Sequence, residues 1–233
     1  MLTVAGLTKR FGARTIIEKL SFGISPGSRV TVFAPSGSGK TTLIQILSGL
    51  EHEFDGTVTL HAQRLATIFQ EPRLFPHLTV RENICLPLKI QRLTLTAELR
   101  AEYVRWLEVC GLTAYEQHYP YQLSGGMKQK VSIIRSFLPR PDFVMLDEPF
   151  TSIDIASKYQ LIRHLLEHSP ATTILFVTHN LDEIPLLTDT LLLFSAPVLG
   201  NFTTYHNLTP ARLSTIIAEC LQTAPQAALA QAE

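Results

Sequence analysis

The stretch Ala34-Pro-Ser-Gly-Ser-Gly-Lys-Thr-Thr42 decides the fold of this chain. It follows a short β-branched run, Arg29–Phe33, that is typical of a buried strand, and it leads into a run of helical character over residues 41–50. A loop of small residues between a strand and a helix lets backbone N–H groups surround a phosphate at the helix N-terminus. The sequence therefore predicts a phosphate-binding loop in an α/β domain whose core sheet is mostly parallel.

The residue types of this loop match the chemical groups of a magnesium nucleoside triphosphate. Gly37 and Gly39 leave room for the phosphates. Lys40 supplies a cation to the β- and γ-phosphates, and Thr41 offers its hydroxyl to Mg²⁺. We expect nucleotide contacts from the whole loop: Ser36, Gly37, Ser38, Gly39, Lys40, Thr41 and Thr42. Ala34 departs from the pattern, which opens with glycine; if the backbone there has a positive φ, its methyl group costs about 1 kcal/mol.

Working outward from the loop, strand-like runs alternate with helical ones. The strand-like runs lie at residues 2–7, 15–24, 29–33, 56–69, 143–147, 172–178 and 190–194. The long stretch 79–140 is helical in character, with residues 98–109 as its clearest amphipathic run. Near the end, Thr209-Pro210 is typical of a helix cap followed by a first-turn proline. One face of that helix is apolar: Leu213, Ile216, Ile217, Cys220 and Leu221.

The composition is that of a packed globular protein. Apolar residues make up 45% of the 233 residues, and 20 basic residues balance 20 acidic ones. A neutral chain lacks the basic face that nucleic-acid binding usually needs, so we expect no nucleic-acid partner. Three cysteines without a C-x-x-C pair predict reduced thiols rather than disulfides or a zinc site. No run approaches the ~18 apolar residues of a membrane span, so a membrane role would require a partner.

Three further motifs follow the phosphate loop in a fixed order. They are Leu123-Ser-Gly-Gly-Met127, Phe143-Val-Met-Leu-Asp-Glu-Pro149 and Thr178-His179. A phosphate loop alone occurs in many nucleotide-binding families, but the serine-glycine-glycine motif narrows the field to one. Over about residues 1–195 the chain resembles the nucleotide-binding subunit of an ATP-binding-cassette (ABC) transporter.

The resemblance implies a P-loop NTPase core of the ABC ATPase type. This is an α/β fold with an inserted helical subdomain and an antiparallel β portion. A single ABC ATPase domain is expected at residues 1–200, with its core at about 1–78 and 140–200 and its helical subdomain at about 79–139. Residues 201–233 are expected to form a C-terminal helix, packed on the parent domain, and a frayed tail.

The resemblance also assigns roles at the nucleotide. Asp147 is expected to hold Mg²⁺ through water, and Glu148 to act as the general base. Gln70 matches the glutamine that senses Mg²⁺ and the γ-phosphate, and Phe11 matches the aromatic residue that stacks on adenine. The catalytic set is then Glu148, His179 and Lys40, and the metal set is Thr41, Gln70 and Asp147. Members of the family commonly have aspartate after the histidine, where this chain has Asn180.

The Leu123–Met127 motif requires a second molecule. In the family, the residues that match Ser124, Gly125 and Gly126 contact the γ-phosphate held by the opposite subunit, at the start of a helix predicted here over 128–137. Met127 replaces the usual glutamine and forfeits an amide hydrogen bond. The 152–154 stretch resembles a loop that crosses the interface. The dimer interface is therefore expected at Ser124, Gly126, Met127, Ser152 and Asp154.

The resemblance implies an ATPase subunit that dimerises around two Mg-ATP, as a homodimer or with a paired ABC subunit, and drives an integral membrane permease from the cytoplasmic face of the cell membrane. The Gln70–Pro76 segment and the short chain resemble the nitrate, sulfonate and taurine importer group, which adds a small anion as substrate and a solute-binding protein as partner. Phe75 is the expected contact for a permease helix. Two alternatives stay open: a soluble non-transport ABC ATPase, and a weakly active nucleotide-binding regulator, which Ala34 and Met127 suggest.

Overall fold

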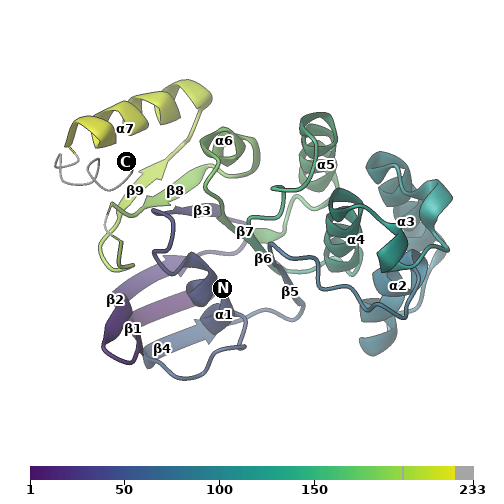
Figure 1. The fold of residues 1–233 in the computed structure, drawn as a ribbon, viewed down its shortest axis with the longest axis horizontal. Coiled ribbons are helices and arrows are strands. Elements are labelled where there is room, and N and C mark those ends of the chain that lie inside the picture. Colours follow the sequence, from purple (N-terminus) through teal and green to yellow (C-terminus); the bar gives the residue numbers. More distant parts are fainter. Residues whose placement is uncertain (196, 224–233) are drawn as a thin grey trace. The chain divides into compact units, whose positions relative to one another are not determined.

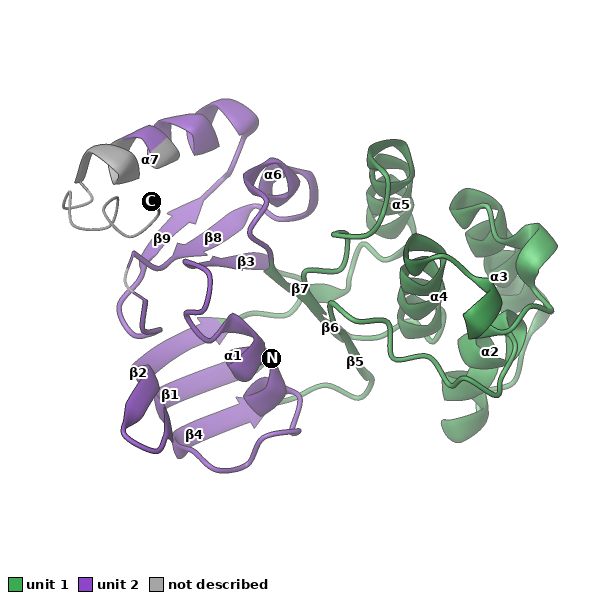
Figure 2. Cartoon of the chain, viewed as in Figure 1, with its two compact units in different colours: residues 1–2, 24–28, 60–177 green, residues 3–23, 29–59, 178–233 purple. Residues whose placement is uncertain are grey.

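The computed structural model describes residues 1–195 and 197–223 of the chain (Figure 1). Two compact units emerge, and each is made of several chain segments (Figure 2). The first contains residues 1–2, 24–28 and 60–177, and the second contains residues 3–23, 29–59 and 178–233. In the described part of the chain, no helix is long and apolar enough to cross a membrane.

The first unit combines parallel strands with four α-helices. The strands are β5 (Leu65–Ile68), β6 (Phe143–Asp147) and β7 (Thr173–Val177), with β6 paired in parallel to both neighbours. All residues of β6 and β7 are buried, as continuous apolar runs in a parallel sheet should be. The helices are α2 (Val80–Ile90), α3 (Ala97–Cys110), α4 (Gly125–Phe137) and α5 (Ile155–His168), with short 3₁₀ turns η1 (Thr113–Tyr115) and η2 (Pro120–Gln122). Figure 1 shows α2, α3 and α4 gathered side by side.

Local sequence explains where these helices begin. Thr79 caps α2 in a reciprocal capping box with Glu82: the backbone N–H of Glu82 donates to Thr79 Oγ1 at 3.2 Å, and that of Thr79 donates to Glu82 Oε2 at 2.8 Å. Thr96 caps α3 through its hydroxyl alone, which accepts the Leu99 backbone N–H, and Gly111 ends that helix with a φ of 65°. The expected amphipathic run at 98–109 is therefore confirmed as α3.

The second unit contains two groups of strands. An antiparallel sheet has the order β2-β1-β4, formed by β1 (Leu2–Phe11), β2 (Arg14–Ile24) and β4 (Asp55–Leu60). The other strands are β3 (Arg29–Phe33), β8 (Thr190–Leu193) and β9 (Thr203–His206), where β8 pairs in parallel with β3 and antiparallel with β9. Its helical elements are α1 (Lys40–Leu47), η3 (Leu181–Glu183), α6 (Ile184–Leu187) and α7 (Pro210–Thr223).

These elements confirm the predicted α/β class with its antiparallel portion. Two details differ from the sequence prediction. The run at 56–69 is two strands, β4 and β5, separated by the irregular residues 61–64. Strand β9 had not been expected, because its four residues are mainly exposed and lack an apolar pattern; its pairing with β8 forms it.

The C-terminal helix α7 packs within its own unit, as predicted. Its cap is Thr209, whose Oγ1 accepts the Arg212 backbone N–H at 3.2 Å. Leu213 and Ile216 are buried in a cluster that also contains Ile184, Leu191 and Leu208. The side chains of Ile217, Cys220 and Leu221, and the tail from residue 224 that we expected to fray, lie outside the described residues.

Candidate functional site

The phosphate loop in the second unit has the geometry its glycines predict. Strand β3 ends at Phe33, helix α1 begins at Lys40, and the turn between them has positive φ at Gly37 (72°) and Gly39 (99°). A Cβ atom on Gly39 would collide with the side chain of Ile16. Gly39 is therefore required twice, once for its left-handed backbone and once for the close approach of β2.

Ala34 fits where the family pattern has glycine. Its backbone is not among those with positive φ, and its side chain is 2% exposed. The strain considered from the sequence does not arise, because an alanine with negative φ is conformationally ordinary. The methyl group instead fills space in the core beside the loop.

Two polar groups of the loop are buried in a way that suits an anion. The Lys40 ammonium donates to the carbonyl oxygens of Ala34 at 2.8 Å and Pro35 at 2.9 Å, and Lys40 is 7% exposed. The hydroxyl of Ser38 is 1% exposed and has no hydrogen-bond partner. Helix α1 also lacks a side-chain cap. A bound phosphate would provide acceptors for the hydroxyl and for N–H groups at the helix N-terminus.

The acidic pair in the first unit follows a fully buried strand. Asp147 is the last residue of β6 and is 3% exposed. Glu148 is half-buried and has a φ of 47°, a left-handed conformation that is uncommon for a residue with a side chain. Its backbone N–H donates to the carbonyl of Val177 at 2.9 Å, which continues the pairing with β7 and holds the turn in place. Strained backbone of this kind is concentrated at functional sites.

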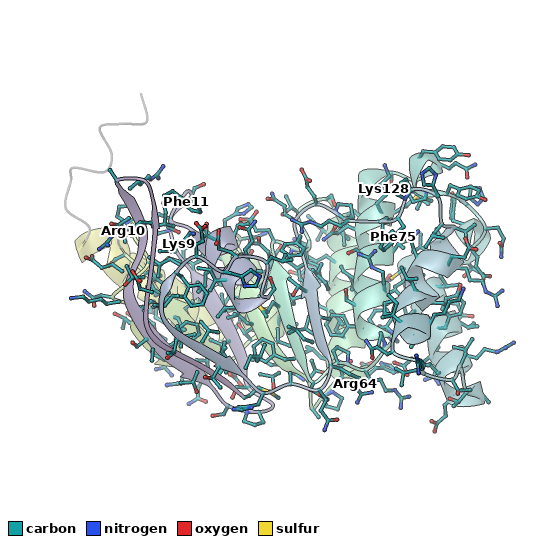
Figure 3. All side chains as sticks on the ribbon, turned by 90° about the horizontal axis from the view of Figure 1, so that it is seen from below. Lys9, Arg10, Phe11, Arg64, Phe75 and Lys128 are labelled. Atoms are coloured by element: carbon teal, nitrogen blue, oxygen red, sulfur yellow. The ribbon has the colours of Figure 1, made fainter. Side chains whose placement is uncertain are left out.

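Gln70 lies just beyond β5 and is exposed. It belongs to the segment Phe69–Thr79, which joins β5 to α2 and has no regular secondary structure, as the prolines at 72 and 76 predicted. Phe75, labelled in Figure 3, is 51% exposed. Leu78 is half-buried. The outward aromatic ring is available to a partner.

The serine-glycine-glycine motif begins helix α4 earlier than expected, at Gly125. Ser124 is its N-cap, and its Oγ accepts the backbone N–H of Met127 at 3.3 Å. Gly125 has open space around its Cα, but a Cβ on Gly126 would lie 2.6 Å from the carbonyl oxygen of Ser152. Gly126 is therefore needed for packing inside one chain, whatever else it contacts.

Asp154 has a local structural role in addition to its expected place at an interface. It is the N-cap of α5, where its Oδ1 accepts the backbone N–H of Ser157 at 2.9 Å. That hydrogen bond, helped by Lys130 at 3.8 Å from its Oδ2, lowers the pKa of the Asp154 carboxyl. Ser152 and Asp154 are both exposed.

His179 is an exposed residue on a turn of the second unit that buried polar groups hold in place. The Thr178 hydroxyl donates to Glu183 Oε2 at 2.8 Å and accepts the Asn180 backbone N–H at 3.0 Å. Asn180, the departure from the family pattern, accepts the Asp182 N–H with its Oδ1 and donates to Glu183 with its Nδ2. The asparagine amide thus serves a carboxylate that is 5% exposed.

Phe11 ends strand β1 and is 51% exposed (Figure 3). The Lys9 ammonium lies 4.6 Å from the centre of its ring, and Lys9 is fixed by an ion pair with Glu51 at 3.2 Å. A cation–π contact therefore orients the ring from one side. The exposed surface of the ring remains free for stacking.

The expected residues divide between the two units. Phe11, the phosphate loop and His179 belong to the second unit. The remaining residues belong to the first unit: Gln70, Ser124, Gly125, Gly126, Met127, Asp147, Glu148, Ser152 and Asp154. Within the first unit, Gly126 is brought against Ser152, and Glu148 is tied to β7.

Sequence reasoning missed three residues that hold the Phe69–Thr79 segment. Asn83 of α2 is fully buried and donates to a backbone carbonyl of the segment. Gln129 and Arg135 of α4 also donate to backbone carbonyls of the segment. Their only signal in the sequence is a polar side chain among apolar helical residues. That signal does not name the backbone groups to which they bind.

Comparisons with known proteins agree with this geometry. The family described as ABC transporter matches residues 17–151. An aliphatic sulfonates import ATP-binding protein of Bacillus cereus is 36% identical over 208 residues, which cover 84% of this chain and 81% of the relative. A spermidine/putrescine import ATP-binding protein of Nitrosomonas eutropha is 33% identical over 195 residues, covering 78% of this chain and 53% of the relative.

A solved structure shares the fold. The dimeric post-hydrolysis state of the ATP-binding cassette MJ0796, bound to ADP and phosphate, matches with a TM-score of 0.77. The match covers 90% of this chain and 100% of that one, at 23% identity. The likeness therefore extends through both units of the chain.

Proposed function

The chain belongs to the ABC transporter family, and on that premise we propose that it is the ATP-hydrolysing subunit of a membrane importer. The observation that carries the proposal is the phosphate loop, in which Lys40 and the unpartnered Ser38 hydroxyl are buried beside an uncapped helix N-terminus. A buried polar atom without a partner costs stability unless a ligand satisfies it. A triphosphate is the ligand whose charge and oxygen atoms suit that set.

Lys40 neutralises the β- and γ-phosphates, and the loop backbone from Ser36 to Thr42 surrounds them. Thr41, Gln70 and Asp147 would hold Mg²⁺, and the bound ion would supply positive charge to offset the charge that develops on the phosphates. Phe11 stacks on the base, with its ring oriented by Lys9. The hydroxyl and carboxylate donors in this set are the oxygen ligands that Mg²⁺ prefers.

Glu148 accepts a proton from the attacking water, and its unusual backbone conformation fixes the direction of its side chain. His179 contacts the γ-phosphate from a turn that Thr178 and Glu183 hold rigid. Positioning and charge stabilisation carry most of the rate in phosphoryl transfer. The placement of these two residues is therefore the main contribution of the protein to hydrolysis.

Ser124 and Gly125 complete the site of a second copy or of a paired ABC subunit. Both are exposed at the start of α4, where the N-terminus of a helix favours an anion. Met127 lies in the same turn without the amide group common in the family, so closure relies on backbone donors. The dimeric form of the related cassette supports this arrangement.

We propose that Phe75 contacts an integral membrane permease from the cytoplasmic face of the membrane, and the exposure of its ring supports this assignment. For the substrate we propose a small oxyanion such as an aliphatic sulfonate, delivered by a solute-binding protein. The sulfonate relative supports this choice, because the match covers 81% of its length, against 53% of the polyamine relative.

Glu148→Gln tests the enzymatic role. The variant should bind Mg-ATP, lose at least about 100-fold in steady-state hydrolysis, and accumulate an ATP-bound dimer, because the base is gone while its volume remains. Phosphate release and size-exclusion chromatography with Mg-ATP measure both effects. Hydrolysis at the parental rate in this variant would place the base elsewhere.

A further inference from the structure

The Phe69–Thr79 segment contains Gln70 near its start and the exposed Phe75 further along. It has no regular secondary structure, and its internal backbone hydrogen bonds are short-range, such as Leu78 N–H to the Phe75 carbonyl at 3.2 Å. A segment with so few internal bonds keeps one conformation only if other groups hold it. Side chains from two helices do so.

The end of the segment near Phe75 is held by α2. Asn83 is fully buried, and its Oδ1 accepts the Phe75 backbone N–H at 2.8 Å. Its Nδ2 lies within hydrogen-bond distance of the carbonyl oxygens of Phe75, Leu78 and Thr79, at 3.1, 2.9 and 3.0 Å. One amide group therefore fixes the turn that presents Phe75.

The end near Gln70 is held by α4, the helix that Ser124 begins. Gln129 Nε2 donates to the Phe69 carbonyl at 3.1 Å, one residue before Gln70. Arg135 Nη1 donates to the Arg73 carbonyl at 2.8 Å. The Arg73 guanidinium in turn lies 3.8 Å from the centre of the Phe69 ring.

Gln129 and Arg135 both have polar groups whose burial lowers the stability of the folded protein. Gln129 is 1% exposed, and its Oε1 is buried without a hydrogen-bond partner. Arg135 is half-buried, burial lowers its pKa, and among residues 1–195 and 197–223 no ion pair engages it. Unsatisfied buried groups are rare in folded proteins and call for a functional explanation.

We propose that Gln129 and Arg135 are positioning residues that make α4 and the Phe69–Thr79 segment move together. A shift of Ser124 on the phosphate of the second copy then reaches Phe75 through α4 and the two side chains. The free Oε1 of Gln129 accepts an N–H of Gln70 when the segment shifts toward the nucleotide. This inference rests on the proposed function, because Gln70 and Ser124 respond only if ATP binds.

The test measures amide hydrogen exchange of the full chain with and without Mg-ATP, in a Glu148→Gln background that retains nucleotide. In the parent, Mg-ATP should slow exchange over both 124–137 and 69–79. In Gln129→Met and Arg135→Met, 124–137 should stay protected, while the protection gained by 69–79 should fall roughly fivefold, the equivalent of one lost hydrogen bond. With Glu148 intact, kcat should fall by a similar factor at unchanged KM.

Gln160→Met on α5 and Arg100→Met on α3 are matched controls, since both residues are exposed and lie on helices other than the two whose side chains hold the segment. If Arg135→Met fails to fold, Arg135→Lys keeps the cation, shortens its reach and carries the same expectation. Undiminished protection of 69–79 in the α4 variants overturns the inference. A parent in which Mg-ATP protects no part of the phosphate loop overturns the proposed function instead.

Discussion

The phosphate loop and the Phe69–Thr79 segment are both irregular, yet they are stabilised in opposite ways. The loop is held by its own residues: glycines with positive φ, and Lys40 folded onto the carbonyls of Ala34 and Pro35. The segment is held by Asn83, Gln129 and Arg135, which lie 4 to 62 residues along the chain from the residues whose carbonyls they bind (83 minus 79; 135 minus 73). A loop that is stabilised by its own residues can be predicted from the sequence, whereas one that is stabilised by residues far along the chain cannot.

The largest expected effect would break the loop from within. Gly39→Ala puts a side chain on a left-handed backbone and into the side chain of Ile16. Strain and overpacking together should destabilise the binding-competent loop by about 3 kcal/mol. ATP should therefore bind roughly 100-fold more weakly. Calorimetric titration with Mg-ATP measures the affinity. Gly37→Ala is the control: it has the same positive φ but open space, so it should lose less.

A smaller effect is expected where the segment is held from outside. Asn83→Ala removes the partners of Phe75, Leu78 and Thr79 and should lower the free energy of unfolding by about 2 kcal/mol. Phe75→Asp should leave the free energy of unfolding nearly unchanged, because the ring is exposed, but should weaken copurification with the permease. Urea denaturation and affinity copurification separate the two. If both variants lowered the free energy of unfolding equally, the assignment of Asn83 to structural support and of Phe75 to partner contact would be wrong.

The smallest expected effect is the pH dependence of the free energy of unfolding that arises from one buried histidine, which another helix covers. His164 of α5 is buried against Trp106 of α3, with ring centres 4.4 Å apart, and its Nε2 has no hydrogen-bond partner. Burial, assisted by His168 and Arg105 and opposed by Glu167, lowers its pKa from 6.5 to about 4. Its contribution to stability is therefore complete above pH 6.5 and is lost as the pH falls toward 4.

The unfolded chain takes up this proton first, so the free energy of unfolding should drop by about 1 kcal/mol between pH 7 and pH 5. His164→Phe should flatten that part of the profile in urea denaturation. A profile that keeps its slope in the variant would assign the dependence to another group. His168→Gln, which removes the stacked neighbour but keeps His164, is the matched control.

The sequence predicted most of the fold because strand periodicity and capping are local. β3, β6 and α3 lie within two residues of the predicted runs, and Thr209 caps α7 as expected. β9 escaped prediction because its partner, and not its composition, makes it a strand. The candidate residues were found from motif spacing. Their supports were not, since Glu183 or Gln129 gains meaning only from the backbone and hydroxyl groups that the fold brings to it.

The two glycines after Ser124 share a motif but not a constraint. Gly126 is demanded by the fold, because Ser152 leaves no room for a side chain, whereas nothing crowds Gly125. A descendant of this chain that lost nucleotide turnover would remain under selection to keep glycine at 126. It would be free to drift at 125. Among relatives of this chain, loss of glycine at 125 would then indicate loss of activity, whereas glycine at 126 would be kept as long as the fold is kept.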